Sequence, residues 1–457
     1  MENGPRSRAA LLPLVLITAL FFLWGVANNL NDVLIPQFKK TFTLNDWQSG
    51  LVQSAFYMGY FVLALPAGMV MRRFGYKSAV VVGLILYGTG ALLFYPAAEA
   101  RQYSYFLVAL FVIASGLAFL ETSANPLMTV LGDPAKSEQR LNFAQAFNPA
   151  GSIAGIFIGR EFILSGHEPT AAQLAALSPA ALEQFRAAEA QAVQGPYLLL
   201  AGVVLILAAI VSLVRFPAQA NRPPADADEG SVLGDLPTLL ARPRFVFGVV
   251  AQFFYVGAQV GVWSFMIRYA QAEEPGMGEK AAAGVLIASL WALFAGRFVG
   301  TALMSLVAPW RLMAGYAAVN VALVAIAVVV GGMTGLYALA ATSFFMSIMF
   351  PTIFATAVKD LGPLTKTGSS FVVMAIIGGA VLTPLMGWIS HVSSMRIAMG
   401  VPAVCFVVVG LYALSAGKAA AARWSTRTII SGGSGPTTAC GRRRTWSRSI
   451  AISDRRT

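Results

Sequence analysis

The chain has 457 residues, of which 57% are hydrophobic and only 11% are charged, and its mean hydropathy is +0.69. Soluble domains carry about 25% charged residues, so this composition excludes an ordinary soluble protein and indicates a polytopic membrane protein. The net charge of +12 does not indicate a nucleic-acid partner, because most Lys and Arg residues lie in loops on one side of the apolar segments.

Apolar segments long enough to cross a bilayer as helices recur twelve times along the chain. The first is too long and too rich in Asn for a signal peptide, so we retain it as a helix. The sequence therefore predicts an all-α membrane protein with twelve transmembrane helices. The predicted helices lie at 11–38, 47–71, 77–97, 103–131, 140–164, 195–215, 245–271, 281–307, 311–331, 333–358, 366–388 and 397–417.

A polar stretch at 216–244 separates the first six predicted helices from the last six. We interpret it as a cytoplasmic linker between an N-terminal six-helix bundle at 11–215 and a C-terminal six-helix bundle at 245–417. The tail at 418–457 ends in sequence without helical periodicity, and we predict that this tail is disordered.

The two halves contain similar patterns of Pro and Gly. Pro126 in the fourth helix is followed by Gly151 in the fifth, and Pro351 in the tenth is followed by Gly378 in the eleventh. This repeated Pro and Gly pattern predicts two six-helix repeats with a binding site at their interface. Gly151 and Gly155 also have the small-xxx-small spacing of tightly packed membrane helices.

Basic residues indicate how the chain is oriented. Arg72, Arg73 and Lys77 follow the second predicted helix, and Arg242 and Arg244 precede the seventh. Cytoplasmic loops are rich in Lys and Arg. We therefore expect a multi-pass protein of the inner (cytoplasmic) membrane with both termini in the cytoplasm.

Two acidic residues lie inside predicted membrane helices. Glu121 is near the middle of the fourth, and a charge there costs roughly 2.5–3.5 kcal/mol against lipid. Asp32 ends a stripe in the first helix, in which Trp24, Asn28 and Asp32 are spaced four residues apart and share a face. Both acids should therefore face a cavity or a polar partner inside the bundle.

Amide side chains recur every third residue in the fifth helix, at Asn142, Gln145 and Asn148. Amides both donate and accept hydrogen bonds, which suits sugar hydroxyls. The alternative is bonding between helices, which we favour for Asn142 because it lies at the cytoplasmic end. In the seventh helix, Gln259 and Trp263 can share a face with Gln252, although Trp is also a common interface anchor.

Arg297 is a cation inside the eighth helix, for which a structural role and a substrate role are both open. We find no nucleotide loop, zinc spacing or metalloprotease motif. Cys405 and Cys440 indicate neither a disulfide framework nor a metal site. The sequence therefore predicts a secondary transporter rather than an enzyme or pump, without a cofactor or a bound metal.

Several runs together resemble the L-fucose–proton symporters of the major facilitator superfamily. The likeness extends roughly from Leu11 to Ala416. The related glucose/galactose branch shares two of these runs, NDVLIP and SIMFPTIF, but typically lacks the acid at Glu121. The runs are FFLWGVANNLNDVLIPQF, GLVQSAFYMGYFVLALPAG, FLETSANP, RLNFAQAFNPAGSIAG, QFFYVGAQVGVWSFMIRYA, GRFVGT, SIMFPTIF and GSSFVVMAIIGGAVLTPLMG.

The resemblance implies the major facilitator fold, a proton-coupling role for Glu121, and a role in both sugar binding and protonation for Asp32. Two positions depart from the pattern. Arg72 stands where the superfamily's basic loop motif has Asp, and Phe350 stands where the fucose branch has tyrosine, which leaves the preferred sugar open. The resemblance places further residues in the sugar cavity, namely Trp24, Asn29, Gln145, Asn148, Trp263 and Arg297.

We therefore predict a monomer that imports L-fucose or a related sugar together with a proton by alternating access across a lipid bilayer. A glucose/galactose-type sugar–proton symporter is the first alternative. A drug-efflux antiporter is disfavoured by the amide side chains, and a membrane enzyme lacks a clear nucleophile or metal site. An uncoupled uniporter or sensor would differ by moving no protons.

Overall fold

The computed structural model describes residues 6–42, 44, 46–131, 133–163, 177–216 and 234–431, and these residues are entirely helices and their connections. The predicted all-α class is therefore confirmed. Contacts divide the chain into two units, Met1–Ala416 and Gly417–Thr457, and the helix bundle belongs to the first. The main helices of its first half are α1 (Arg6–Phe42), α2 (Asp46–Leu92), α3 (Phe94–Ala100), α4 (Tyr103–Val130), α5 (Ser137–Gln145), α6 (Phe147–Ile158), η2 (Gly159–Ile163), α8 (Pro179–Gln191) and α9 (Gln194–Leu213).

The second half comes after the short helix α11 (Leu236–Leu240). Its helices are α12 (Pro243–Glu273), α13 (Glu279–Leu303), α14 (Pro309–Val329), α15 (Gly332–Met346), α16 (Met349–Val358), α17 (Thr365–Met374), η4 (Ala375–Ile377), α18 (Gly378–Val392), α19 (Met395–Ala398) and α20 (Gly400–Ser431).

The 47 residues of α2 form two membrane crossings. As one straight helix they would measure about 70 Å, more than twice the thickness of the hydrocarbon core. Gly75 has φ 85° and ψ 173°, a conformation that favours glycine, and it interrupts the helix. Gly59 and Gly90, on either side of this turn, both contact residues 109–115 of α4, so the chain reverses at Gly75.

Ten helices within the described residues are long and apolar enough to span a membrane, whereas the sequence predicts twelve. The reversal at Gly75 turns one of these ten into two crossings. The predicted span at 140–164 is not among them because it is broken into α5, α6 and η2 near Ala146, and no single piece is long enough. These two features account for the difference.

The two halves share the same close contact between helices. A Cβ added at Gly151 in α6 would lie 1.9 Å from the carbonyl oxygen of Phe22 in α1, and one added at Gly378 in α18 would lie 2.0 Å from that of Phe253 in α12. Only glycine permits backbones to approach this closely. The predicted tight packing at Gly151 is confirmed, and the equivalent contact recurs in the second half.

The outward faces are apolar. Leu199, Ile206 and Leu213 recur every seven residues along one face of α9 and are 69%, 63% and 83% exposed, and Val404 and Leu411 of α20 are also exposed. Such contiguous apolar faces are unfavourable in water and suit lipid. The protein is therefore a multi-pass membrane protein.

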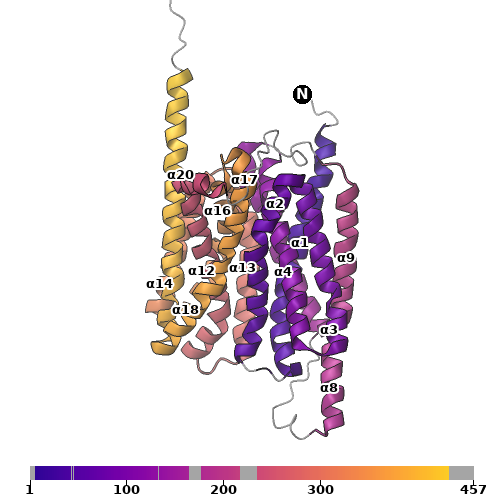
Figure 1. The fold of residues 1–457 in the computed structure, drawn as a ribbon. Helices are drawn as coiled ribbons and strands as arrows, with labels where there is room; N and C mark the ends of the chain where they lie inside the picture. The colour runs from indigo at the N-terminus through magenta and orange to yellow at the C-terminus, as the bar shows by residue number, and fades with distance from the viewer. Residues whose placement is uncertain are drawn as a thin grey trace, which may run out of the picture. The chain divides into compact units, whose positions relative to one another are not determined.

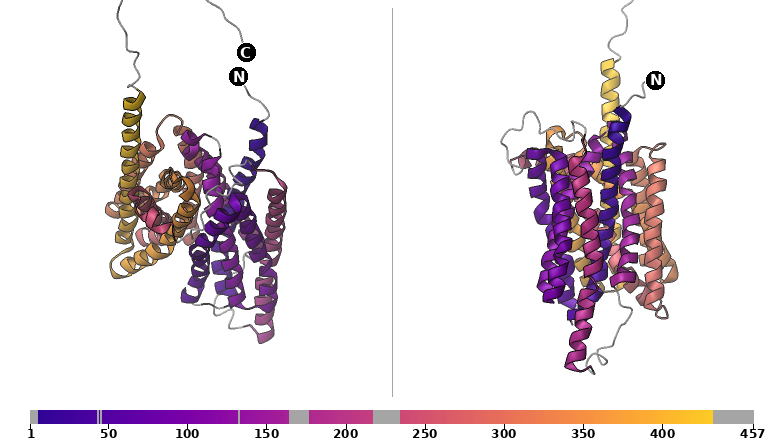
Figure 2. Two further views of the ribbon diagram at one scale, coloured as in Figure 1. Left: turned by 45° about the horizontal axis from the view of Figure 1, so that its top comes forward. Right: turned by 90° about the vertical axis from the view of Figure 1, so that its right-hand side faces the viewer.

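The helices define two ends of the bundle. The start of α1 lies at the same end as α16 and α17, which we call the N-terminal end, and α8 projects beyond α3 and α9 at the opposite end (Figures 1 and 2). At the N-terminal end, Arg72 forms an ion pair with Asp235, next to α11. Asp235 also accepts a hydrogen bond from Thr367 of α17 at 2.8 Å, so a carboxylate next to α11 links the two halves.

The helix α20 continues to Ser431, past residue 418, where the predicted tail begins. The disorder predicted for 418–457 stays a prediction. The run KAAAAR at 418–423 consists of residues with high helix propensity, which explains the extension. Residues 432–457 lie outside the described part of the chain.

Candidate functional site

A cavity of about 240 Å³ lies between the two halves. Small-molecule sites for drug-sized ligands occupy about 300–1,000 Å³, so this volume suits a smaller solute. It is lined by Phe21, Trp24, Asn28, Asn29, Phe56, Tyr57, Tyr60, Glu121, Gln145, Asn148, Pro149, Ser152, Val256, Gln259, Val260, Trp263, Ser264, Leu290, Leu293, Arg297, Phe350 and Ile376.

Every predicted site residue whose side chain is described lines this cavity. These residues are Trp24, Asn29, Glu121, Gln145, Asn148, Gln259, Trp263 and Arg297. Asp32 belongs to α1, but its side chain lies outside the described part of the structure. The prediction for Asp32 therefore stays a prediction.

Glu121 sits in a deeply buried part of α4. Its residue is only 1% exposed, and α4 is buried on all sides from Ile113 to Met128. Among the described side chains, no cation forms a salt bridge with its carboxylate. Burying an unpaired ionised carboxylate is costly, so this environment strongly favours the neutral form. The structure thus places Glu121 in the cavity wall, and its role in proton coupling stays a prediction.

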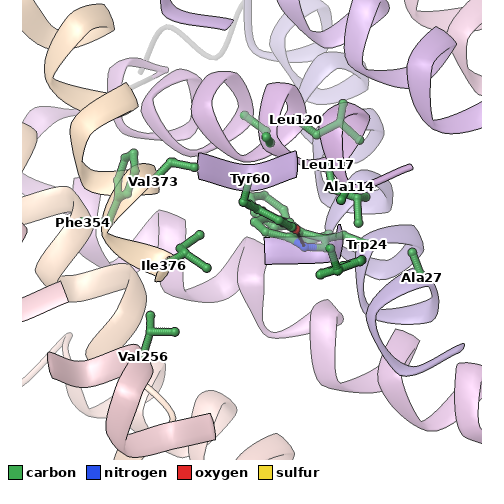
Figure 3. Close-up of a cluster of buried hydrophobic side chains, with 14 of the residues drawn as sticks. Trp24, Ala27, Tyr60, Ala114, Leu117, Leu120, Val256, Phe354, Val373 and Ile376 are labelled. Atoms are coloured by element: carbon green, nitrogen blue, oxygen red, sulfur yellow. Dashed lines mark hydrogen bonds between the residues drawn. The ribbon is translucent and has the colours of Figure 1, made fainter. Parts of the chain in front are cut away.

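Trp24 and Tyr60 point toward one another beside the cavity, with Val256 and Ile376 of the second half nearby (Figure 3). The indole Nε1 of Trp24 donates a hydrogen bond to the hydroxyl oxygen of Tyr60 at 2.8 Å. This bond fixes the indole, and Phe21 stacks on it with ring centroids 5.8 Å apart. The cavity therefore presents a rigid aromatic surface from the first half.

A second aromatic residue faces the cavity from α12. The Nε1 of Trp263 donates to the hydroxyl oxygen of Ser343 at 2.9 Å, and Ser343 is bonded in turn to Ser289 at 2.5 Å. Trp263 is therefore held by α13 and α15 inside the bundle. The alternative interpretation of this residue as an anchor at the membrane interface is wrong.

The amides of the first half are positioned by backbone carbonyl groups of α1. Asn29 donates to the carbonyl oxygen of Gly25 at 3.2 Å, and Asn148 of α6 donates to that of Phe21 at 3.3 Å. In both cases the bond uses Nδ2, so the Oδ1 atoms remain available as acceptors for a ligand.

Gln145 connects three helices. Its Nε2 donates to Oδ1 of Asn125 at 2.8 Å, and Arg297 Nη1 donates to its Oε1 at 2.9 Å and to its backbone oxygen at 3.0 Å. Arg297 is 5% exposed, and its Nε has no hydrogen-bond partner among the described residues. Arg297 therefore bonds to a helix of the first half and also lines the cavity, so both roles left open by the sequence remain possible.

Two amides singled out in the sequence do not reach the cavity. Asn142 donates to Thr352 Oγ1 of α16 at 3.1 Å, as expected for a residue that joins helices. Gln252 is fully buried and lies away from the cavity lining. Gln252 and Gln259 both belong to α12, but they lie seven positions, or about two helical turns, apart. Only Gln259 lines the cavity.

Phe350 lines the cavity, and its ring makes an edge contact with Tyr255 at 6.2 Å between centroids. The Tyr255 hydroxyl donates to the Met346 carbonyl oxygen at 3.2 Å. This part of the wall therefore presents an aromatic ring without a hydroxyl.

Sequence reasoning missed the two tyrosines of α2. Tyr57 and Tyr60 both line the cavity, together with Ser152 of α6 and Ser264 of α12. Their three-residue spacing in an apolar helix was the available signal, because residues i and i+3 lie on one face. Within the described residues, no group of three or more His, Cys, Asp or Glu side chains could hold a metal ion.

Comparison with known proteins gives matches along most of the chain. The profile described as Major Facilitator Superfamily matches residues 16–371. The L-fucose-proton symporter of Escherichia coli (strain K12) is 46% identical over 415 residues, which cover 90% of this chain and 94% of that protein. The glucose/galactose transporter of Brucella abortus is 37% identical over 406 residues, which cover 88% and 93%.

Solved structures agree with these matches. A crystal structure of the transporter FucP in the outward conformation superposes with a TM-score of 0.83 at 45% identity, covering 89% of this chain and 99% of that one. The proton:xylose symporter XylE superposes with a TM-score of 0.67 at 12% identity, which shows the fold alone. The chain therefore belongs to the major facilitator superfamily, as a homologue of the L-fucose–proton symporters, and it is a transporter rather than an enzyme.

Proposed function

We propose that this protein imports L-fucose, or a sugar closely related to it, together with a proton across the bacterial inner membrane. The observation that carries the proposal is the cavity between the halves, in which a buried carboxylate, Glu121, lies among amides and tryptophans. Its support is the 46% identity to a protein named as an L-fucose-proton symporter.

Proton coupling rests on Glu121. In a cavity that opens alternately to either side, the carboxylate takes a proton from one side and releases it to the other. The buried position favours the neutral carboxylic acid while the cavity is closed. Entry of one proton contributes about 2.3 kcal/mol per 100 mV of membrane potential, in addition to any pH gradient.

Sugar binding rests on the remaining polar wall. Asn29, Asn148 and Gln259 supply donors and acceptors for hydroxyl groups. Trp24 and Trp263 supply flat apolar surfaces from the two halves for the C–H face of a sugar ring. Asp32 remains proposed as a second group that responds to both sugar and proton.

The proposed orientation has both termini in the cytoplasm, supported by the basic residues at the N-terminal end, such as Arg72, Arg73 and Lys77. Cross-half bonds gather at this end, for example between Lys359 and Glu138. In this orientation the described conformation is closed toward the cytoplasm. We propose that one monomer contains the complete transport path, because the cavity lies between the two halves of one chain.

Uptake into cells that express the full chain tests the substrate. We expect radiolabelled L-fucose to accumulate, unlabelled L-fucose to compete strongly, and D-galactose and D-glucose to compete weakly. Addition of the transported sugar to de-energised cells should make the medium more alkaline. Uptake without alkalinisation would overturn proton coupling, and the absence of uptake of all three sugars would overturn the substrate class.

A glucose/galactose transporter is the second candidate. Phe350 supports it, because the cavity lacks a hydroxyl at that position, and so does the 37% identity to the Brucella abortus protein. In that case D-glucose and D-galactose would compete more strongly than unlabelled L-fucose in the same uptake experiment.

A further inference from the structure

One face of the short helix α5 carries a row of polar residues that bond to residues of the second half. Glu138, Gln139, Asn142 and Gln145 lie at positions i, i+1, i+4 and i+7, which share one side of a helix. Asn142 bonds to Thr352 of α16 at 3.1 Å. Gln139 Nε2 donates to the Thr301 backbone oxygen of α13 at 3.2 Å, and Lys359 Nζ lies 2.6 Å from Glu138 Oε1.

The last member of this row differs from the others because it reaches the cavity. Gln145 and its partner Arg297 both line the cavity, whereas Glu138, Gln139 and Asn142 do not. The row therefore runs from the cavity wall toward the N-terminal end and holds the halves together along that path. A ligand in the cavity can contact only the Gln145–Arg297 bond directly.

The geometry of this bond makes it sensitive to a ligand. Asn125 fixes the amide orientation, because its Oδ1 accepts from Nε2 and leaves Oε1 directed at Arg297. A ligand hydroxyl that donates to Oε1 competes with the guanidinium for the same oxygen. Within the described residues, Arg297 is a buried cation held only by oxygens of Gln145, with Nε unpartnered, so ligand oxygens would be favourable new acceptors.

We infer that the Arg297–Gln145 bond is a clamp that the bound sugar releases. The clamp keeps the N-terminal end closed in the empty transporter. When a sugar hydroxyl donates to Gln145 Oε1 and sugar oxygens accept from Arg297, the guanidinium exchanges both of its bonds to Gln145 for bonds to the sugar. The row then loses the cross-half contact at its cavity end, and the halves can separate at the N-terminal end. This inference rests on the proposed function and adds to it the step by which substrate starts the opening.

The test measures opening directly on the full chain. Ser370 of α17 is fully buried between the halves, where it packs against Gly68 of α2, so a cysteine at this position reacts with a maleimide only when this end opens. The reporter is Ser370→Cys in a chain whose native cysteines are replaced, Cys405→Ala and Cys440→Ala. Purified protein is labelled with and without L-fucose, and separately with D-galactose and D-glucose.

Arg297→Met removes the clamp. Hydrogen bonds to a charged group contribute about 1.5–3 kcal/mol, so the labelling rate without sugar should rise roughly tenfold or more. Sugar should add little to that rate. Arg297→Lys retains a cationic donor and should restore slow labelling without sugar.

Gln139→Ala is the matched control, because it breaks the neighbouring cross-half bond without touching the cavity. Its labelling should still accelerate when sugar is added, by the same factor as in the parent chain. The inference is overturned if Arg297→Met labels as slowly as the parent without sugar, or if it responds to sugar as strongly as Gln139→Ala does.

Failure of the proposed function gives a different pattern. If the parent chain neither binds nor responds to any of the three sugars, the substrate assignment is wrong. The rate of Arg297→Met without sugar then still decides whether Arg297 holds the N-terminal end closed, because that rate involves no ligand.

Discussion

The two halves present different surfaces to the same cavity. The first half supplies an acid, amides and hydroxyl groups beside a smaller apolar part, namely Asn28, Asn29, Tyr57, Tyr60, Glu121, Gln145, Asn148 and Ser152 with Phe21, Trp24, Phe56 and Pro149. The second half supplies a largely apolar wall with a few polar groups, namely Val256, Gln259, Val260, Trp263, Ser264, Leu290, Leu293, Arg297, Phe350 and Ile376.

This difference contrasts with the scaffold, which repeats. Gly151 packs on the Phe22 carbonyl group in the first half as Gly378 packs on the Phe253 carbonyl group in the second. The repeated architecture therefore sets how the helices meet, while the side chains on the cavity faces set the chemistry. On this basis we expect proton and sugar chemistry to depend mainly on the first half, and substitutions in each half can test that expectation.

The largest expected effect is at Glu121. Glu121→Gln mimics the protonated state, so the variant should retain exchange of labelled for unlabelled sugar and lose all accumulation driven by a pH gradient. Both are measured in proteoliposomes. Glu183→Gln, on the exposed part of α8, is the control and should accumulate sugar normally. Full pH-driven accumulation by Glu121→Gln would exclude Glu121 from proton coupling.

The scaffold should respond equally in the two halves. Gly151→Ala and Gly378→Ala each place a methyl group against a carbonyl oxygen, and overpacking of this kind costs about 1–3 kcal/mol or more. Thermal unfolding of the purified protein should show a clearly lower midpoint for both. Gly202→Ala faces open space and should have little effect. A strong effect in only one half would contradict the structural repeat.

Sugar affinity should depend more on the first half than on the second. Asn148→Ala removes a positioned amide and should weaken sugar binding by up to about tenfold, since one hydrogen bond contributes about 0.5–1.5 kcal/mol. Gln259→Ala, on the wall of the second half, should weaken it less. Titration of intrinsic tryptophan fluorescence measures both, and an equal loss would weaken the contrast between the halves.

The smallest effect is expected at Phe350. Phe350→Tyr adds a hydroxyl to the apolar wall and should change the preference between L-fucose and D-galactose by roughly threefold to tenfold. Competition uptake measures the change. Phe157→Tyr, on an exposed face of α6, should leave the preference unchanged. An unchanged preference in Phe350→Tyr would exclude this position from sugar selection.

Much of the site could be predicted from the sequence, because polar side chains are costly against lipid. A carboxylate or amide inside an apolar helix is costly against lipid in any fold, so Glu121, Gln145 and Asn148 had to face the interior. Tyr57 and Tyr60 were missed because tyrosine is tolerated both at lipid interfaces and in cores, so its presence carries little information. The extension of α20 to Ser431 follows local helix propensity rather than apolar periodicity.

The helices, the membrane environment and the side chains that had to avoid lipid could all be read from the order of residues along the chain. The partners of those side chains depend on the packed fold: Trp24 with Tyr60, Gln145 with Arg297, and Arg72 with Asp235. The physical reason is that helical periodicity states which residues share a face of one helix, but not which other helix that face meets. Glycine contacts such as Gly151 on Phe22 set those meetings, and with them the cavity.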